Sequence, residues 1–235
     1  MLGLGNLITG GSPPSEFTID QVSGLNLWLK FNTGQGAITD GIEWRDSSGN
    51  DNHASQTTDA QEGAGFSEGA FVTDSGNQDN LDLTSDIDLT GSYSIFIALD
   101  LSEETNETLL SSVNNASFIR FAQGGTSTKY RMKHNGTATS PLDITITALG
   151  LNFCVVCIRR DANNSNRISI RKDGSEIIDS EVTATGTGTF ALEQIGTTSN
   201  GATSAKIYEV AVYNEYLSDE NATKVEDKIE KRIGL

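Results

Sequence analysis

The sequence predicts an all-β protein, a two-sheet antiparallel sandwich with one C-terminal helix. Of its 235 residues only 36% are hydrophobic and 7% aromatic, whereas Gly, Ser, Thr, Asn and Asp are abundant throughout. That composition is typical of short strands joined by turns. Strand-length apolar segments also recur at intervals near those of a sandwich, and a helical pattern is found only at the end. The length fits one large domain, which we place at residues 16–235, after an extended N-terminal arm at residues 1–15.

The first strand is expected in LNLWLKF, because its apolar residues alternate. Trp28 should lie on one face, and the other face should carry Leu25, Leu27, Leu29 and Phe31. Further short strands are expected in GIEWRD, GAFVTD, LDL, TLLSSV, SFIRFAQ, KYRMKHN, DITITAL, TFALEQIG and AKIYEVAVYN.

The segment YSIFIALDL, residues 93–101, is the expected centre of a sheet, because apolar residues occupy both of its faces. A meander follows in NFCVVCIRR and RISIRKDGSEII, with a tight turn at Asp173 and Gly174. Cys154 and Cys157 should be buried thiols on opposite faces of their strand. A Cys-x-x-Cys motif that binds metal or does redox work would need a turn or a helix N-terminus instead.

One helix is expected at the end of the chain. Ser218 can cap its N-terminus, and acidic residues follow in the first turn. A single apolar stripe then runs through Ala222, Val225, Ile229 and Ile233. We expect this helix to lie on the edge of the sandwich.

The charge balance excludes some partners. Lys and Arg number 16 and Asp and Glu number 32, which gives a net charge of −16. Such a surface repels a phosphate backbone, so nucleic acid is not an expected partner. The opening MLGLGNLITGG lacks a basic region, and glycines break its apolar run. It therefore matches neither a secretory signal peptide nor a membrane-spanning helix, and we expect no membrane insertion.

The segment EWRDSSGNDNHASQ raises the question of catalysis, because it contains both an acid and a histidine. Asp46 and His53 would need a nucleophile or a water-activating pair at hydrogen-bond distance. A structural role is favoured, in which Asp46 accepts hydrogen bonds in an Asx-type turn and Gly49 permits the reversal. Asn52 and His53 would satisfy loop amides. A metal site is disfavoured, because the second histidine, His134, is distant in sequence.

Two motifs carry a family resemblance. The first is GLNLWLKF followed by EWRDSSGNDNHASQ, and the last is the C-terminal KIYEVAVYNEYLSDENATKVEDKIEKRIGL. Over residues 22–235 the chain resembles the concanavalin A-like, or laminin G-like, jelly-roll domains. The residues that match the first motif are Trp28, Trp44, Asp46, Ser48, Gly49, Asn50, Asn52, His53 and Ala54. Those that match the last are Glu209, Val210, Tyr213, Asn214, Leu217, Ser218 and Gly234. The resemblance implies that they are fold markers of a two-sheet jelly roll.

The resemblance also implies a carbohydrate-binding or adhesion module, sometimes with calcium at the rim of the sandwich. The segment SGNQDNLDL resembles the place where such domains hold an acidic calcium ligand, which makes Asp79 the residue to test. A polar turn without metal is the favoured alternative, so no bound cofactor is expected.

An enzyme is the less favoured interpretation. Glycoside hydrolases on this sandwich present two glutamates flanking an aspartate on one strand, because retaining carboxyl groups must lie about 5 Å apart. The sequence contains no such strand. Glu226 and Glu230 fall on the helix, and turn residues separate Asp82, Asp86 and Asp88, so we interpret both groups as solvated surface.

Two functions remain. The first is a structural protein of a virus particle, such as a decoration, fibre or tail-associated subunit of a tailed bacteriophage, assembled in the host cytoplasm. Its arm would dock on other virion subunits, in a homo-oligomer, through Leu2, Leu4, Leu7 and Ile8. The lectin-like domain would contact host surface glycans. This hypothesis relies on fold analogy, and fold alone does not determine function.

The second function is a non-catalytic carbohydrate-binding module of a cellular adhesin or of a polysaccharide-degrading system. Sugar rings stack on exposed aromatic side chains, and the candidates are Tyr130, Tyr208 and Tyr216. The alternative is that these tyrosines pack within the strands. Neighbouring capsid and tail genes would favour the first function, and transport or hydrolase genes the second.

Overall fold

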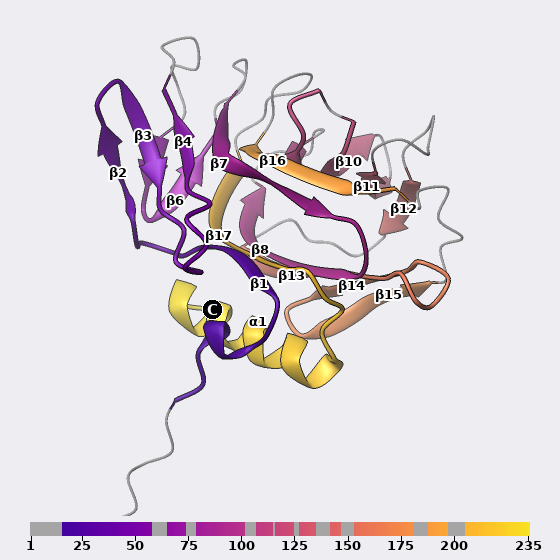
Figure 1. Ribbon diagram of the computed structural model, residues 1–235. Coiled ribbons are helices and arrows are strands. Elements are labelled where there is room, and N and C mark those ends of the chain that lie inside the picture. Colours follow the sequence, from indigo (N-terminus) through magenta and orange to yellow (C-terminus); the bar gives the residue numbers. More distant parts are fainter. Residues whose placement is uncertain are drawn as a thin grey trace, which may run out of the picture.

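The computed structural model describes residues 16–57, 65–73, 79–101, 107–114, 116–124, 127–134, 142–146, 153–180, 188–196 and 205–235. Two antiparallel sheets pack face to face, and one helix lies against the lower of the two in Figure 1. The predicted two-sheet sandwich with a C-terminal helix is therefore confirmed. The predicted arm, with its four apolar residues, lies outside the described residues.

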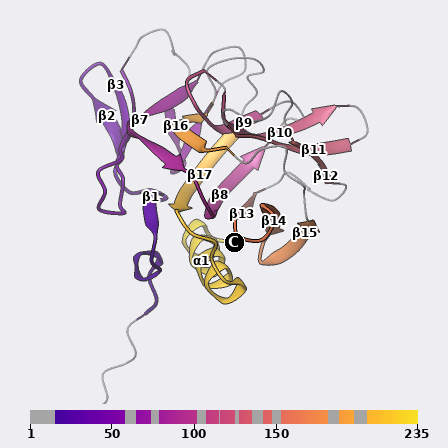
Figure 2. The same ribbon diagram turned by 45° about the vertical axis from the view of Figure 1, so that its right-hand side comes forward.

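The first sheet, called sheet 1, contains the strands on which the helix packs. Its order is β15 (Ser175–Ser180), β14 (Arg167–Lys172), β13 (Cys154–Asp161), β8 (Tyr93–Leu101), β17 (Ala205–Tyr213), β6 (Ala70–Val72) and β5 (Gly65–Ser67). Strand β1 (Leu25–Leu29) also pairs with β17. Figure 2 shows β17, β8 and β13 between the helix and the second sheet.

The second sheet, called sheet 2, forms the other layer. Its order is β12 (Leu142–Ile146), β11 (Ser127–Lys133), β10 (Phe118–Gly124), β9 (Glu107–Ser111), β16 (Phe190–Gly196), β7 (Asn80–Leu89), β4 (Ala54–Gln56), β3 (Gly41–Trp44) and β2 (Gln35–Ile38). Along β7 buried and exposed residues largely alternate, as expected for a sheet with one solvated face.

Three short strands were not predicted, namely β2, β4 and β5, and β7 is longer than the predicted LDL. Their sequences QGAI, ASQ and GFS are too short and too rich in small residues to show a period-2 pattern. Each becomes a strand because a neighbour supplies its hydrogen-bond partners, as β3 does for β2 and β4. Pairing, rather than local preference, determines these elements.

The predicted central strand β8 is covered on both faces. Ile95, Ile97 and Leu99 belong to the core between the two sheets. Phe96 and Ala98 point the other way and pack beneath the helix. The strand is thus buried over nearly its whole length, which explains its continuous apolar sequence.

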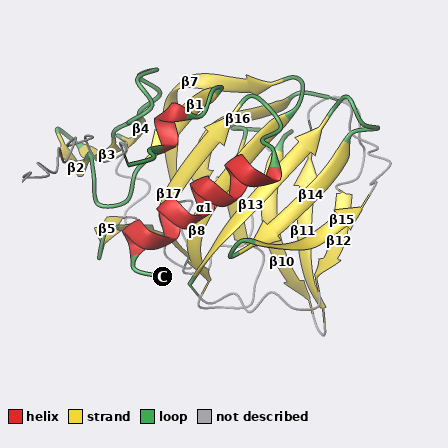
Figure 3. Cartoon of the chain, turned by 90° about the horizontal axis from the view of Figure 1, so that it is seen from below, coloured by secondary structure: helices red, strands yellow, loops and turns green. Residues whose placement is uncertain are grey.

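The helix α1 (Asp219–Ile233) crosses the outer face of sheet 1, over β8 and β13, as Figure 3 shows from below. The prediction that it lies on the sandwich edge was wrong. Sheet 1 has apolar residues on both faces, so its outer face must also be covered, and the helix stripe covers it. The ends match the prediction, because Asn221 N donates to Ser218 Oγ at 3.3 Å and Gly234 has a left-handed φ of 88°.

Strand β1 departs from the predicted alternation at both ends. Leu27 and Leu29 face sheet 2, and Trp28 faces the helix side, as predicted. The register against β17 shifts between Leu25 and Leu27, so Leu25 packs on the same side as Trp28. Phe31 follows the end of the strand and packs there too. A β-bulge inverts side-chain alternation in this way.

The meander agrees with its prediction. Asp173 and Gly174 form the turn between β14 and β15, with φ values of 47° and 72°. Cys154 lies in the core between the sheets and Cys157 lies under the helix, so the two free thiols are on opposite faces of β13. Burial raises the pKa of Cys154 to about 12, which keeps that thiol protonated and unreactive at neutral pH.

Candidate functional site

Asp46 is the centre of the turn that follows β3. Its Oδ1 accepts hydrogen bonds from Trp28 N and Ser48 N, both at 2.8 Å. Its Oδ2 accepts from Ser48 Oγ at 2.7 Å and from Asn52 N at 3.1 Å. The carboxylate therefore fastens the turn to β1, and its lone pairs are used for backbone support.

The other residues of this turn also bond to backbone groups. Asn50 Nδ2 donates to Leu25 O at 2.9 Å, and Asn52 Nδ2 donates to Asn26 O at 3.0 Å. His53 Nδ1 accepts from the backbone N of Asp46 at 3.2 Å, so the imidazole contacts the peptide of Asp46. Gly49 has a positive φ of 90° at the reversal. These contacts match the structural interpretation and leave the acid and the histidine without a shared catalytic geometry.

Glu209 ties β17 to β1 and to the helix. Its buried carboxylate accepts from Trp28 Nε1 at 2.7 Å and from Phe31 N at 3.2 Å, and it forms an ion pair with Arg232. Burial raises the pKa of Glu209, and the nearby positive charge of Arg232 opposes that shift. The Arg232 guanidinium also lies 5.0 Å from the centre of the Trp28 ring.

Two further motif residues are buried and hydrogen-bonded. Trp44 is fully buried between the sheets, and its Nε1 donates to Lys30 O at 3.0 Å. Tyr213 is buried under the helix, where its hydroxyl donates to Ile19 O at 3.1 Å. Both positions support the fold rather than a ligand.

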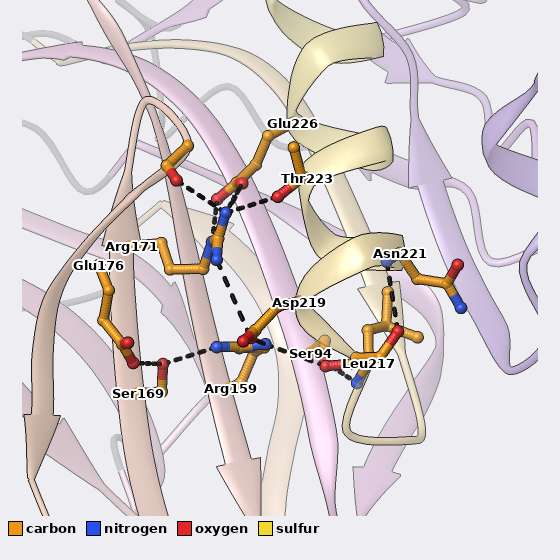
Figure 4. Close-up of polar contacts among 12 residues, drawn as sticks. Ser94, Arg159, Ser169, Arg171, Glu176, Leu217, Asp219, Asn221, Thr223 and Glu226 are labelled. Carbon is orange, nitrogen blue, oxygen red and sulfur yellow. Dashed lines mark hydrogen bonds and ion pairs between the residues drawn. The ribbon is translucent and has the colours of Figure 1, made fainter.

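A charged network joins the helix to sheet 1 (Figure 4). Arg171 Nε donates to both carboxylate oxygens of Glu226 at 3.1 Å, and Arg171 Nη2 donates to Thr223 Oγ1 at 2.8 Å. The interpretation of Glu226 as solvated surface was wrong, because its side chain is fully buried. Glu226 shares the helix face of the apolar stripe, and a buried arginine provides the charge that permits its burial. Glu230 is half-buried, whereas Asp82, Asp86 and Asp88 are exposed as expected.

Arg159 forms the second half of this network. It is 1% exposed and donates from Nη1 to Asp219 Oδ1 at 2.6 Å and to Leu217 O at 3.0 Å. Its Nη2 donates to Ser169 Oγ at 3.0 Å. The guanidinium also lies 4.7 Å from the centre of the Tyr216 ring. Arg159 therefore fixes the segment between β17 and α1.

A hollow of ≈ 640 Å³ lies beside that segment, at one rim of the sandwich. Three connections meet there, from β7 to β8, from β13 to β14, and from β17 to α1. We call it the rim hollow, and it is lined by Gly91, Ser92, Asp161, Ala162, Asn163, Asn214, Glu215 and Tyr216.

The loops around the rim hollow are held by their own hydrogen bonds. Ala162 N donates to Ser92 Oγ and Asn163 N donates to Asp161 Oδ1, both at 3.0 Å. The backbone carbonyl of Glu215 accepts from Ser94 Oγ at 2.9 Å. The hollow thus combines a half-buried aromatic ring with amide and carboxylate side chains on anchored loops. Hydroxyl-rich ligands suit such a set, because amides donate and accept whereas carboxylates accept.

Of the three candidate tyrosines, only Tyr216 lines this hollow. Tyr130 is fully buried between the sheets. Tyr208 is 9% exposed and packs against the rings of Phe31 and Phe153. A sugar ring therefore cannot stack on Tyr130 or Tyr208, because the alternation of side chains along each strand directs both tyrosine rings into packed clusters.

The calcium hypothesis stays a prediction. Asp79 is fully buried just before β7, and residues 75–78 of the quoted segment lie outside the described residues. Within the described ranges, no group of three or more His, Cys, Asp or Glu side chains could hold a metal ion.

His134 lies in a second buried polar cluster, at the end of β11. Its Nε2 is 3.1 Å from the hydroxyl of Tyr93, and its ring contacts Phe190 edge-on. Burial, together with the positive charge of Arg160, lowers the pKa of His134 to about 3. The imidazole is therefore neutral at physiological pH. It is far from His53 in the fold as in the sequence, since His53 precedes β4 in the other half of sheet 2.

No local pattern in the sequence indicates the rim hollow, because its residues come from three loops that are distant along the chain. The sequence does contain a weak signal for the charged network, because Arg159 and Arg171 interrupt largely apolar strands. A cation in such a strand indicates a buried partner, but only the packed helix identifies that partner. No helix in the described part of the chain is long and apolar enough to cross a membrane.

No family model matches the chain, and no curated protein matches it in sequence. Solved structures do share its fold. One concerns botulinum neurotoxin type C, whose cell entry depends on interaction with two ganglioside molecules. It matches with a TM-score of 0.63 and 15% sequence identity, and the match covers 90% of this chain and 52% of that one. Another is the binding domain of botulinum neurotoxin DC in complex with rat synaptotagmin II, with TM-score 0.65, 16% identity, and coverage of 88% and 52%.

A third is the ligand-binding domain of botulinum neurotoxin serotype D in complex with N-acetylneuraminic acid, with TM-score 0.61, 12% identity, and coverage of 89% and 51%. The present chain thus spans about half the length of each of these structures. At such low identity the likeness establishes the fold, which is the concanavalin A-like sandwich that the two sequence motifs indicated.

Proposed function

We propose that this domain is a non-catalytic carbohydrate-binding module and that the rim hollow is its binding site. The observation that carries the proposal is the place of Tyr216, a half-buried ring at the rim of a hollow lined by hydrogen-bonding side chains. Aromatic rings with a polar surround are how proteins bind the apolar faces and hydroxyl edges of sugars.

Arg159 prepares the ring for this role. Its guanidinium covers one face of Tyr216 and is itself held by Asp219 and Leu217 O, so the ring orientation is fixed before any ligand binds. A sugar would stack on the opposite face, while Asn163 and Asp161 would bond to its hydroxyls. A site that is preorganised in this way loses less entropy on binding.

Two features of the comparisons support a sugar ligand. The structures with the same fold include one of a toxin whose cell entry depends on gangliosides and one in complex with N-acetylneuraminic acid. Those ligands belong to those proteins. The support for this chain is that proteins containing this sandwich, of which it spans about half the length, bind sugars, and that its own rim has the required side chains.

The test is a glycan array probed with wild-type protein and three variants. Tyr216→Ala should weaken binding about tenfold, which corresponds to about 1.4 kcal/mol, whereas Tyr216→Phe should keep most of it because the ring remains. Asn163→Ala removes an exposed side chain and should weaken binding without changing the melting temperature. Asp40→Asn, in the exposed turn between β2 and β3, is the matched control outside the hollow. A wild-type protein that binds no glycan, or a Tyr216→Ala variant that binds normally, would refute the proposal.

A role in a virion is a separate proposal. It is supported by the apolar residues of the N-terminal segment, which would place the module on a particle assembled in the host cytoplasm. That segment lies outside the described residues, so the support comes from its sequence alone. The two proposals are compatible, since a virion subunit can carry a glycan-binding domain.

A further inference from the structure

We infer that the rim hollow selects neutral sugars and rejects acidic ones such as sialylated or uronic glycans. This inference rests on the proposed function, and it concerns which sugars the same site accepts. It starts from the charges of the lining, which includes two carboxylates, Asp161 and Glu215, and no lysine or arginine.

The two carboxylates are placed to accept hydrogen bonds from sugar hydroxyls. Among the described residues, Asp161 Oδ1 is bonded to Asn163 N, and Glu215 Oε1 is bonded to Ser23 Oγ. Each carboxylate has a second oxygen, with lone pairs available for a donor. Adjacent hydroxyls of a neutral sugar are such donors, whereas the carboxylate of an acidic sugar is an acceptor only.

The nearby arginines do not line the hollow, and their hydrogen bonds are made inside the protein. Arg159 and Arg160 are each 1% exposed, and the donors of Arg159 are directed to Asp219, Leu217 O and Ser169. Arg160 donates to Asn166 and to Gly188 O. Both guanidiniums are therefore used inside the protein.

Arg167 lies opposite Asp161 in the register of β13 and β14 and is half-buried. Arg167 is not among the residues that line the rim hollow, and its positive charge contributes to the lowered pKa of Asp219. If the charge of Arg167 offsets that of Asp161, the negative charge of Glu215 still faces the hollow. The surrounding chain has a net charge of −16, which adds to the repulsion of an anionic ligand. Like charges placed together in a binding site oppose binding strongly.

The experiment compares matched glycans that differ only in a terminal acidic group, for example lactose and sialyllactose, within a panel of such pairs. Binding of the wild-type protein should be at least about tenfold stronger for the neutral member of each bound pair. Higher salt should reduce this preference, because it screens the repulsion.

Variants then assign the preference to the two carboxylates. Asp161→Asn and Glu215→Gln keep the size of each side chain and remove its charge, so together they should raise binding of the acidic member and lower the preference. Asp40→Asn, in the exposed turn between β2 and β3 at the edge of sheet 2, lies away from the hollow and should leave the preference unchanged.

The outcomes separate this inference from the proposed function. Equal or stronger binding of the acidic member by the wild-type protein would overturn the inference and leave the carbohydrate-binding function intact. An unchanged preference in the doubly neutralised variant would also overturn it. Absence of binding to every glycan in the panel would refute the proposed function, and with it the inference.

Discussion

The indole Nε1 of Trp28 donates a 2.7 Å hydrogen bond to the buried carboxylate of Glu209, which lies 181 residues further along the chain. This contact joins the first strand of the sandwich to β17 near the end of the chain. Arg232, from the helix, completes the group by pairing with Glu209 and lying over the Trp28 ring. The two ends of the domain are thus connected by one carboxylate.

Replacing that carboxylate should be costly. Glu209→Ala removes one partner from Trp28 Nε1, Phe31 N and Arg232 at once, and leaves buried donors without an acceptor. We expect a loss of about 3 kcal/mol in the free energy of unfolding, measured by urea denaturation. Glu220→Ala, which removes an exposed ion pair with Lys224 on the same protein, is the control and should change stability little. Equal stability of the two variants would contradict the role given to Glu209.

Trp44 should be critical for the fold. Its side chain is fully buried between the sheets, so Trp44→Ala should cost about 3 to 5 kcal/mol in the free energy of unfolding. Trp44→Phe should cost less, because an aromatic ring still fills part of the volume. A purified Trp44→Ala protein that melts at the wild-type temperature would show that this placement is wrong.

The ion pair between Arg171 and Glu226 should show strong coupling. Glu226→Ala leaves the Arg171 guanidinium with a reduced set of partners in a buried site, and should destabilise the protein by about 3 to 5 kcal/mol. The double variant Arg171→Met/Glu226→Leu should be more stable than Glu226→Ala alone, because it removes both charges together. A double-mutant cycle based on chemical denaturation measures this coupling. Strictly additive effects would indicate that the two residues act independently.

His134 should make the protein sensitive to mild acid. Its pKa in the folded state is about 3, below the ordinary value of 6.5, so the unfolded chain binds a proton that the folded chain does not. Stability should therefore fall as the pH decreases from 6.5 towards 3, by about 2 kcal/mol on reaching about pH 5. His134→Gln should remove this part of the decline. Urea denaturation at several pH values compares the two slopes, and parallel slopes would disprove the assignment.

Deleting residues 2–14 tests the arm. Leu2, Leu4, Leu7 and Ile8 lie among the flexible residues Gly3, Gly5, Gly10 and Gly11, so the sequence gives this segment no reason to fold alone. Burying these four side chains against another subunit could contribute on the order of 6 kcal/mol before the entropy of ordering is subtracted. The deletion should leave β circular dichroism and melting temperature nearly unchanged but prevent assembly into multimers or particles. Normal assembly of the truncated protein, or its failure to fold, would remove the support for an assembly arm.

The sequence by itself determined the elements whose pattern is local. The alternation around Trp28, the two-sided apolar run of β8, the Asp173–Gly174 turn and the cap at Ser218 could all be predicted. Each depends on a period of two or 3.6 residues, or on a backbone conformation that few residue types adopt. The same is true of the bonds from Ser48 and Asn52 to Asp46, whose partners are close in sequence.

Only the tertiary structure decided where the helix lies and which polar groups meet. The stripe of the helix shows that it packs on something, but the outer face of sheet 1 becomes the partner only once both faces of β8 and β13 are formed. Glu226 is charged, so the sequence alone predicts that its side chain is exposed to solvent. Its burial is explained by the ion pair with Arg171, which lies on a strand distant in sequence. The rim hollow is a similar case, because Ser92, Asn163 and Tyr216 come together only when three loops converge. Long-range packing brings such residues together, and a local pattern contains no information about it.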